Sequence, residues 1–274
     1  MTNRRIERTD SKRSMRTVVI FCFAVFLLIT TSVAIKFALL WSQNKFDSSH
    51  SFVLEIKNKN DAELIIFSPE EKSVSFLKVN DKNLAKRTLS RELGVPVDAI
   101  IPGDHIYNSQ SELASYLFSL TFRLNSDTKE LTPFDYLRLA LFAQSADLSK
   151  SSKKEITLPL SDPEVNLIIG DMFYDKSILR DDVSLEIINA SGILGAGNEV
   201  ARLFGHIGVN VVAVRTSSEI KKPSTLSYFG GKTYTLKRIS HLSDLEPAEL
   251  KGEHIADIVL TIGDDKIFTA IFKK

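Results

Sequence analysis

The sequence predicts an α+β protein in three parts: an N-terminal transmembrane helix, a small α+β domain and a βαββαβ domain of the ferredoxin-like type. The first part follows from a long apolar run near the N-terminus. The second follows from three strand-like segments succeeded by helical patterns, and the third from an alternation of strand and helix patterns near the C-terminus. Because 43% of the residues are hydrophobic, the chain can form packed domains and is not generally disordered.

An apolar segment spans residues 18–41 and contains one charged residue, Lys36. As an α-helix it is roughly 36 Å long, which is enough to cross a bilayer. The basic tail before it, residues 1–17, carries six arginine and lysine residues against two acidic ones. The positive-inside rule therefore predicts a single-pass protein of the cell membrane, with its N-terminus in the cytoplasm and its domains outside.

A cleaved signal peptide is an alternative for the same segment. The stretch Ser-Val-Ala that ends at Ala34 fits a small-x-small cleavage site. The apolar run continues past it to Trp41, whose indole suits a membrane interface, and this favours an uncleaved anchor. Cys22, the one cysteine of the chain, lies inside the span, so the exported part is expected to have no disulfide.

The first exported domain is predicted over residues 50–160. Segments rich in β-branched or aromatic residues predict strands at 52–57, 62–67 and 73–79. Helical patterns follow at 82–93, 111–124 and 132–144. The last of these opens with Thr132 as its cap and Pro133 at the first helical position. The stretch 144–155 is rich in serine and lysine, which predicts a loop.

The second exported domain is predicted over residues 182–274. Its strands are expected at 184–189, 209–214, 225–229 and 257–262. Between the first two strands, apolar residues follow the spacing of one helix face, and Gly208 ends this helix. These apolar residues are Val200, Leu203, Phe204 and Ile207. A weaker helix is expected at 232–243, where the stretch "TYTL" favours a strand by propensity.

The loop after the first strand of this domain is rich in glycine, which raises the question of phosphate binding. A dinucleotide fingerprint requires G-x-G-x-x-G, but counting from Gly195 the third glycine position is occupied by Val200. The sequence therefore favours a structural role. Ser191 and Gly192 are expected to form a tight strand-to-helix turn, whereas Gly195 and Ala196 are expected to let the helix lie close to the sheet.

Charge and residue spacing argue against other classes of function. Removing the +4 of the basic tail from the whole-chain charge of +1 leaves −3, so the exported part is not expected to bind nucleic acid. The five histidines show no ligand spacing, so no metal or other cofactor is expected. Near the C-terminus, Asp264 and Asp265 follow Gly263. An acidic turn after the last strand is the commoner explanation of this stretch, and a cation site is the alternative.

Two motifs in residues 182–274 resemble the C-terminal domain carried by many LytR-CpsA-Psr proteins. The stretch "NASGILG" matches the N-x-[ST]-G-x-x-G signature of that domain, and "GDD" matches its ending. The matching residues are Asn189, Ser191, Gly192 and Gly195 in the first motif and Gly263, Asp264 and Asp265 in the second. The resemblance extends to the order of the expected strands and implies a role at the cell envelope, without supplying a ligand.

Residues 50–160 resemble a shortened form of the same family's catalytic domain, which transfers polyprenyl-pyrophosphate-linked glycopolymers to the cell wall. Asp81 matches the aspartate of the family's I-P-R-D motif, whereas Val79 and Asn80 replace its proline and arginine. The family's arginine-rich segment, which grips pyrophosphate, has no counterpart in this chain. Asp81 is thus the candidate catalytic residue that the resemblance leaves.

Transfer from a lipid pyrophosphate requires fixed cations that stabilise the charge on the phosphate oxygens. The arginines that this domain offers are Arg87, Arg91, Arg123 and Arg138. Each lies in a helix-like stretch, where a solvated helix face is a sufficient explanation for it.

The first hypothesis is a membrane-anchored, extracytoplasmic protein of cell-envelope or cell-wall assembly that acts as a non-catalytic binding or scaffold module. Its partners would be the membrane together with an envelope polymer, a polyprenyl lipid or an envelope protein. A divergent polyprenyl-pyrophosphate-dependent glycopolymer transferase, which would use magnesium, is the alternative. A membrane-bound envelope regulator is a third hypothesis, although about 16 residues before the anchor leave no room for a DNA-reading helix.

Overall fold

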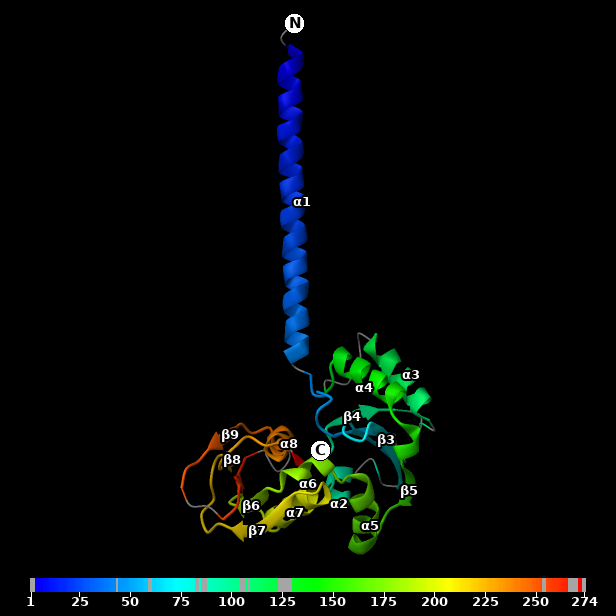
Figure 1. Cartoon of the computed structure of the whole chain (residues 1–274), viewed down its shortest axis with the longest axis vertical. Helices are drawn as coiled ribbons and strands as arrows, with labels where there is room; N and C mark the ends of the chain where they lie inside the picture. The colour runs from blue at the N-terminus through cyan, green and yellow to red at the C-terminus, as the bar shows by residue number, and fades with distance from the viewer. Residues whose placement is uncertain are drawn as a thin grey trace. The chain divides into compact units, whose positions relative to one another are not determined.

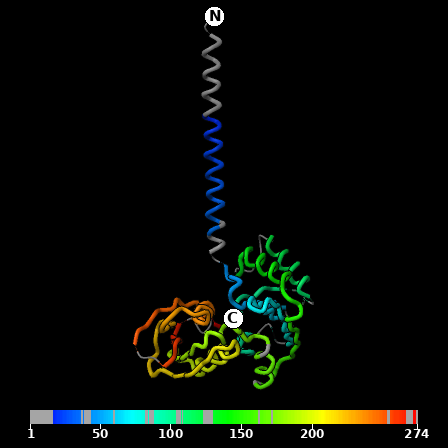
Figure 2. Tube along the Cα trace, viewed as in Figure 1, coloured from blue at the N-terminus to red at the C-terminus, as the bar shows by residue number. Residues whose placement is uncertain are grey.

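The computed structural model divides the chain into two units, residues 1–44 and residues 45–274. The residues that it describes are 3–42, 44–58, 61–81, 84, 88–103, 107, 109–122, 130–252, 255–265 and 271–272. Among these, the side chains of 3–16, 37, 39–42, 162 and 171 are left out of the description. The course of the chain can be followed in Figure 2. The described part holds eight α-helices and two five-stranded mixed sheets, which confirms the α+β class (Figure 1).

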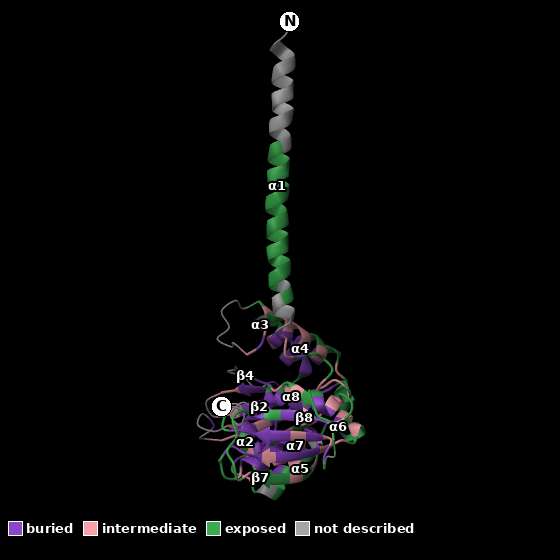
Figure 3. Cartoon of the chain, turned by 90° about the vertical axis from the view of Figure 1, so that its left-hand side faces the viewer, coloured by how far each residue is buried: buried purple, intermediate pink, exposed green. Residues whose placement is uncertain are grey.

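The N-terminal unit contains one described helix, α1 (Asn3–Ser42). Its segment Thr17–Lys36 is long and apolar enough to cross a membrane. The described side chains of this segment are exposed along its whole length (Figure 3). A helix that is apolar on every side requires apolar surroundings, and a bilayer supplies them. The predicted N-terminal apolar helix is thus confirmed.

The first sheet of the larger unit has the strand order β4-β1-β2-β3-β5. Its strands are β1 (Phe52–Lys57), β2 (Asp61–Ser68), β3 (Ser73–Asn80), β4 (Ala99–Pro102) and β5 (Lys153–Thr157). The central three are antiparallel, and the two edge strands run parallel to their neighbours. The three predicted strands are confirmed. The loop predicted at 144–155 is wrong at its end, because pairing with β3 makes a strand of a lysine-rich segment that suits a sheet edge.

Helices cover both faces of this sheet (Figure 1). Those on its two faces are α3 (Gln110–Thr121) with α4 (Pro133–Ser145), and α2 (Leu89–Leu93) with α5 (Asp162–Met172). The cap predicted at Thr132 is present, and it forms a capping box: the Thr132 side chain accepts from the Asp135 N–H, and the Asp135 side chain accepts from the Thr132 N–H. The helix predicted at 82–93 is described only as α2, and part of its first half lies outside the described residues. The sequence pattern did not indicate α5.

The second sheet has the order β7-β6-β10-β8-β9. Its strands are β6 (Ser184–Asn189), β7 (Asn210–Thr216), β8 (Thr225–Tyr228), β9 (Pro247–Glu249) and β10 (Ile258–Ile262). In a ferredoxin-like domain another strand separates the two parallel strands of each βαβ unit. Here β6 and β7, which α7 (Ala196–His206) connects, pair directly in parallel. The ferredoxin-like arrangement is therefore not confirmed, and β9 adds an edge strand that the sequence pattern did not indicate.

The core of this second half lies between its sheet and the helices α7 and α8 (Tyr234–Ser243), next to the short α6 (Lys176–Asp181). The predicted apolar face of α7 is buried, with Phe204 fully inside. The segment 234–243 is a helix despite its strand propensity, because Leu236, Ile239 and Leu242 are buried at helical spacing. The Thr233 side chain caps this helix by accepting from the Leu236 N–H.

Candidate functional site

The first family-like motif is a hydrogen-bonded turn between β6 and α7. The Asn189 Oδ1 atom accepts from the N–H and the hydroxyl of Ser191, at 3.2 and 2.7 Å. The Asn189 Nδ2 donates to the carbonyl of Ile193 at 2.9 Å, and the Ile193 N–H donates to the Ser191 hydroxyl at 3.1 Å. The polar side chains of the motif thus bond to one another and to their own loop, as an Asx-type turn does.

The glycines of this motif serve backbone conformation. Gly192 and Gly195 have φ values of +77° and +80°, a region that side chains disfavour. The prediction that Gly195 brings the helix close to the sheet is wrong, because a Cβ placed there would meet nothing within 4 Å. Gly197 makes that approach, since its Cβ would lie 3.0 Å from Cγ1 of Val214 in β7. Ala196 is fully buried at the start of α7.

The second motif fastens the loop before β8 to the end of β10. The Asp265 carboxylate accepts from the Ser224 N–H at 2.6 Å and from its hydroxyl at 2.7 Å. The Gly263 N–H donates to the Ser224 hydroxyl at 2.8 Å. A Cβ on Gly263 would lie 2.8 Å from backbone atoms of this loop, including the Lys221 carbonyl oxygen. Asp264 contacts the exposed Lys222 ammonium at 3.5 Å. The motif therefore forms a structural clasp.

Asp81 follows the end of β3 and is half-buried. The two residues that depart from the family motif have contacts of their own. Val79 is fully buried in the core. The Asn80 Nδ2 donates to Glu155 Oε1 at 2.7 Å, which also accepts from the Lys78 ammonium at 2.8 Å. These hydrogen bonds, the one from Lys78 foremost, lower the pKa of Glu155. Asn80, at the position of the arginine in the I-P-R-D motif, thus helps to hold the edge strand β5.

The candidate arginines that the structure describes are held by contacts within the fold. The Arg91 Nε and a terminal nitrogen donate to the two carboxylate oxygens of Glu199, at 2.7 and 2.8 Å. Arg138 donates to the carbonyl of Phe46 at 3.0 Å. Two further candidates lie outside the described residues: Arg87 and Arg123. Within the described residues, the arginines of this domain do not converge on one groove.

A buried ion pair joins the two halves of the larger unit. Asp98, just before β4, and Arg238, on α8, have side chains that are 1% and 2% exposed. The guanidinium donates to both carboxylate oxygens, at 2.8 and 3.0 Å, and the Val53 N–H donates to Asp98 Oδ2 at 2.7 Å. Burial alone would raise the pKa of Asp98, but the charge and hydrogen bonds of Arg238 hold that pKa below its usual value. Both groups are therefore charged.

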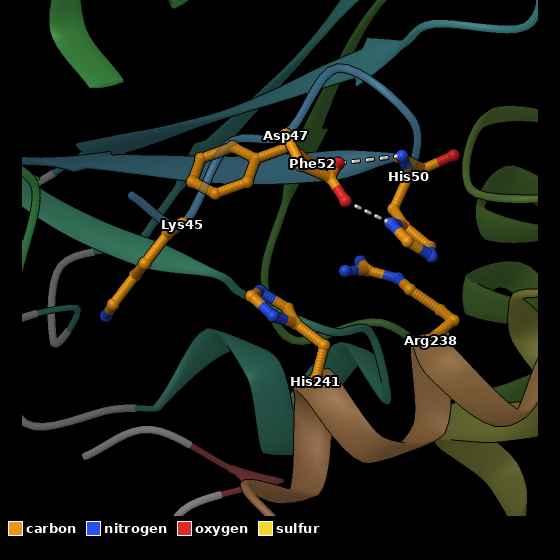
Figure 4. A pocket seen from close by; sticks show the side chains of 7 residues that line it. Lys45, Asp47, His50, Phe52, Arg238 and His241 are labelled. Atoms are coloured by element: carbon orange, nitrogen blue, oxygen red, sulfur yellow. Dashed lines mark hydrogen bonds and ion pairs between the residues drawn. The ribbon is translucent and has the colours of Figure 1, made fainter. Parts of the chain in front are cut away.

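A group of titratable side chains borders this pair (Figure 4). Arg238 and His241 reach from α8 toward Asp47 and His50, which precede β1. The Asp47 carboxylate and His50 Nδ1 are 2.6 Å apart. Burial opposes the charge on Asp47, yet the hydrogen bonds from His50 and Ser49 lower its pKa. Burial lowers the pKa of His241, partly opposed by the Asp98 carboxylate 3.8 Å away. We call Asp47, Asp98, His50, Arg238 and His241 the polar junction.

The polar junction has little room for a ligand. The hollow among these side chains measures about 10 Å³, which is about the space of a single water molecule. One flank of the junction is closed because the ring of Tyr234 stacks on His50, with ring centroids 4.7 Å apart. The Tyr234 hydroxyl donates to Asp175 at 2.6 Å, and Ser51 donates to the same carboxylate. The charges therefore fasten two sheets together, with no space for a substrate among them.

Sequence reasoning missed the Asp98–Arg238 pair. A local signal existed on one side, since Arg238 lies between the apolar positions Leu236 and Ile239 of a predicted amphipathic helix. Its partner is 140 residues away in the chain, so no spacing rule connects the two. A buried arginine in such a helix predicts a buried carboxylate without identifying it.

A larger hollow lies between α3 and α4. It measures about 320 Å³. Its lining residues are Ser111, Ala114, Ser115 and Phe118 on α3 and Ala140, Leu141 and Gln144 on α4. None of these side chains is charged. This hollow, hereafter the apolar hollow, has the room that the polar junction lacks, but its described lining has none of the junction's charge.

The described residues contain no group of three or more His, Cys, Asp or Glu side chains arranged to hold a metal ion. No protein-family model, curated protein or solved structure matches this chain.

Proposed function

We propose that the protein is a membrane-anchored, extracytoplasmic module of cell-envelope assembly that acts by binding and not by catalysis. The apolar helix α1 supports the anchorage, and the positive charge of residues 1–17 supports an orientation with the larger unit outside. The motifs "NASGILG" and "GDD" support the link to the cell envelope, because they resemble those of the C-terminal domain of LytR-CpsA-Psr proteins.

One observation carries the non-catalytic part of the proposal: the described arginines and the hollow that could hold a ligand lie in different places. Transfer from a lipid pyrophosphate needs several cations directed at the same phosphate oxygens. The described side chains of Arg91, Arg138 and Arg238 instead bond to protein oxygens. The apolar hollow could hold part of a ligand, but none of the described residues that line it is charged.

The turn formed by the first motif supports a binding role. Its hydrogen bonds fix a loop that presents two large apolar side chains to solvent, with Ile193 46% and Leu194 99% exposed. A loop held by the fold is a common carrier of binding residues, and exposed apolar side chains on it lose contact with water when a partner covers them. We therefore propose that this loop binds an envelope protein, in addition to the contact that α1 makes with the membrane.

Membrane fractionation combined with external proteolysis tests the proposal. We expect the full-length chain to stay in the membrane after a carbonate wash, because an uncleaved apolar helix is held by lipid. Protease added outside intact cells or spheroplasts should remove a fragment of nearly the full mass. A soluble mature form that begins near Ile35 would contradict the anchor. Degradation only after the membrane has been permeabilised would contradict the orientation.

A further inference from the structure

We propose that the outer face of α3 and α4 rests on the lipid surface of the membrane in which the chain is anchored. We call this face the lipid-facing patch and define it by Phe118 and Leu141, which line the apolar hollow, and by Phe122, whose ring packs against Phe118. The inference rests on the anchorage in the proposed function and adds a second point of contact with the membrane.

The lipid-facing patch is apolar although it lies outside the core. Its side chains are 49%, 69% and 55% exposed in chain order. The two phenylalanines pack edge to face, with centroids 5.2 Å apart, so they form one raised aromatic cluster. Beside them the apolar hollow is lined by small, hydroxyl and amide side chains without a charge. Contiguous exposed apolar surface of this kind marks an interaction site.

The course of the chain indicates what covers this patch. The apolar segment of α1 ends at Lys36 and the larger unit begins at Lys45, so eight residues separate them. Even fully extended, such a connection reaches only about 30 Å. At its end, the N–H groups of Lys45 and Phe46 donate to Asp135 Oδ1, at 2.9 and 3.0 Å. Asp135 lies in the first turn of α4.

The start of α4 is therefore the point at which the chain coming from the membrane enters the larger unit. α3 packs along α4, so both helices of the lipid-facing patch belong to this tethered part of the fold. Phenylalanine and leucine beside polar side chains suit the boundary between headgroups and acyl chains. A lipid surface thus fits the chemistry of the patch and lies within reach of the tether.

Quenching by spin-labelled lipid in proteoliposomes tests this contact. In the full-length chain with Cys22→Ser, Leu141→Cys carries a small environment-sensitive fluorophore, and phosphatidylcholine–phosphatidylglycerol vesicles contain doxyl-labelled lipid in both leaflets. Leu167→Cys is the matched control, because Leu167 is an 80% exposed leucine on α5, which covers the opposite face of the same sheet. We expect severalfold stronger quenching at position 141 than at position 167. Both sites are exposed, so thermal melting should match that of the parent.

Three outcomes would overturn the inference. Equal quenching at the two positions would show that the patch does not meet lipid. If the unlabelled Leu141→Cys variant forms a disulfide dimer under mild oxidation and the labelled one is weakly quenched, a second copy of the chain covers the patch. Failure of the protein to float with the vesicles would contradict the membrane anchorage, and therefore also the proposed function and the orientation that it includes. Flotation with equal quenching would overturn only the lipid contact.

Discussion

An active site combines charged groups with space for a substrate, whereas in this protein the charged groups lie at the polar junction and the space lies at the apolar hollow. At the polar junction, Asp98 and Arg238 are both charged and almost fully buried, yet the space beside them is about 10 Å³. At the apolar hollow the space is about 320 Å³, but no lining side chain that the structure describes is charged. Charge stabilises a transition state only where the reacting group can lie against it.

The buried charges of this protein therefore serve to hold its fold together. A buried ion pair contributes little net stability, because its attraction is offset by loss of hydration. It becomes costly to disturb once the fold depends on it, since either partner alone is an uncompensated buried charge. The polar junction is thus expected to fix the relative placement of the two sheets, and the exposed surface to carry the binding.

The largest expected effect comes from breaking the buried pair. Asp98→Ala leaves the guanidinium of Arg238 buried without its counter-ion, so we expect the free energy of unfolding to fall by about 3–5 kcal/mol. Denaturant unfolding of the detergent-solubilised chain measures this. The control is the double variant Asp98→Leu with Arg238→Met, which removes both charges and should lose much less. A loss below about 1 kcal/mol for Asp98→Ala would show that the pair is not integral to the fold.

A second buried carboxyl, that of Glu55, differs from that of Asp98 because no guanidinium of the described residues lies beside it. Glu55 in β1 is 2% exposed, and burial raises its pKa to about 7, only partly opposed by the Lys57 ammonium 3.9 Å away. The raised pKa means that folding favours the protonated form. Its contribution to stability is full below about pH 4.5 and is lost as the pH rises through about 7.

Glu55→Gln fixes this side chain in a neutral form. At about pH 8.5 the variant should exceed the parent in unfolding free energy by about 3 kcal/mol, and near pH 4 the difference should vanish. Unfolding curves across this pH range measure the effect. The control is Glu219→Gln, which makes the same substitution at an exposed position. A constant difference between the Glu55→Gln variant and the parent at all pH values would contradict the raised pKa.

The smallest of the stability effects concerns the clasp at the end of β10. A Cβ on Gly263 would lie 2.8 Å from three backbone atoms of the facing loop, so Gly263→Ala should cost about 1–3 kcal/mol. Gly231→Ala is the matched control, since a Cβ there meets nothing within 4 Å and should leave the melting curve close to that of the parent. Equal melting temperatures for the two variants would show that the close contact at Gly263 does not contribute to stability.

Local sequence patterns predicted most of the helices and strands. Strand pairing and packing depend on contacts between distant residues, and the sequence did not predict them. The strands 52–57 and 184–189 match β1 and β6, because side-chain spacing and propensity are properties of neighbouring residues. The edge strand β5 depends on pairing with β3, which no local pattern contains. The direct pairing of β6 with β7 and the close approach of Gly197 to the sheet likewise depend on the assembled fold.

The candidate site divides in the same way. The motif residues Asn189 and Ser191 bond within one loop, so the tight turn predicted there is present. The polar junction draws its members from before β1, before β4 and from α8, and its central pair spans 140 positions. Spacing along a sequence carries no information about such a contact, so sequence reasoning missed the polar junction.

A glycan-transfer assay is the most direct test of the proposal that this protein binds its partner without catalysing a reaction. The full-length protein is incubated with Mg²⁺ and a polyprenyl-pyrophosphate donor that carries a labelled glycan, beside an Asp81→Ala variant and a transferase of established activity. Since loss of one charge-stabilising contact typically costs about 100-fold or more in rate, we expect release of label at background level, equal in the protein and its variant. Magnesium-dependent turnover that Asp81→Ala abolishes would contradict the account and make the protein a glycopolymer transferase.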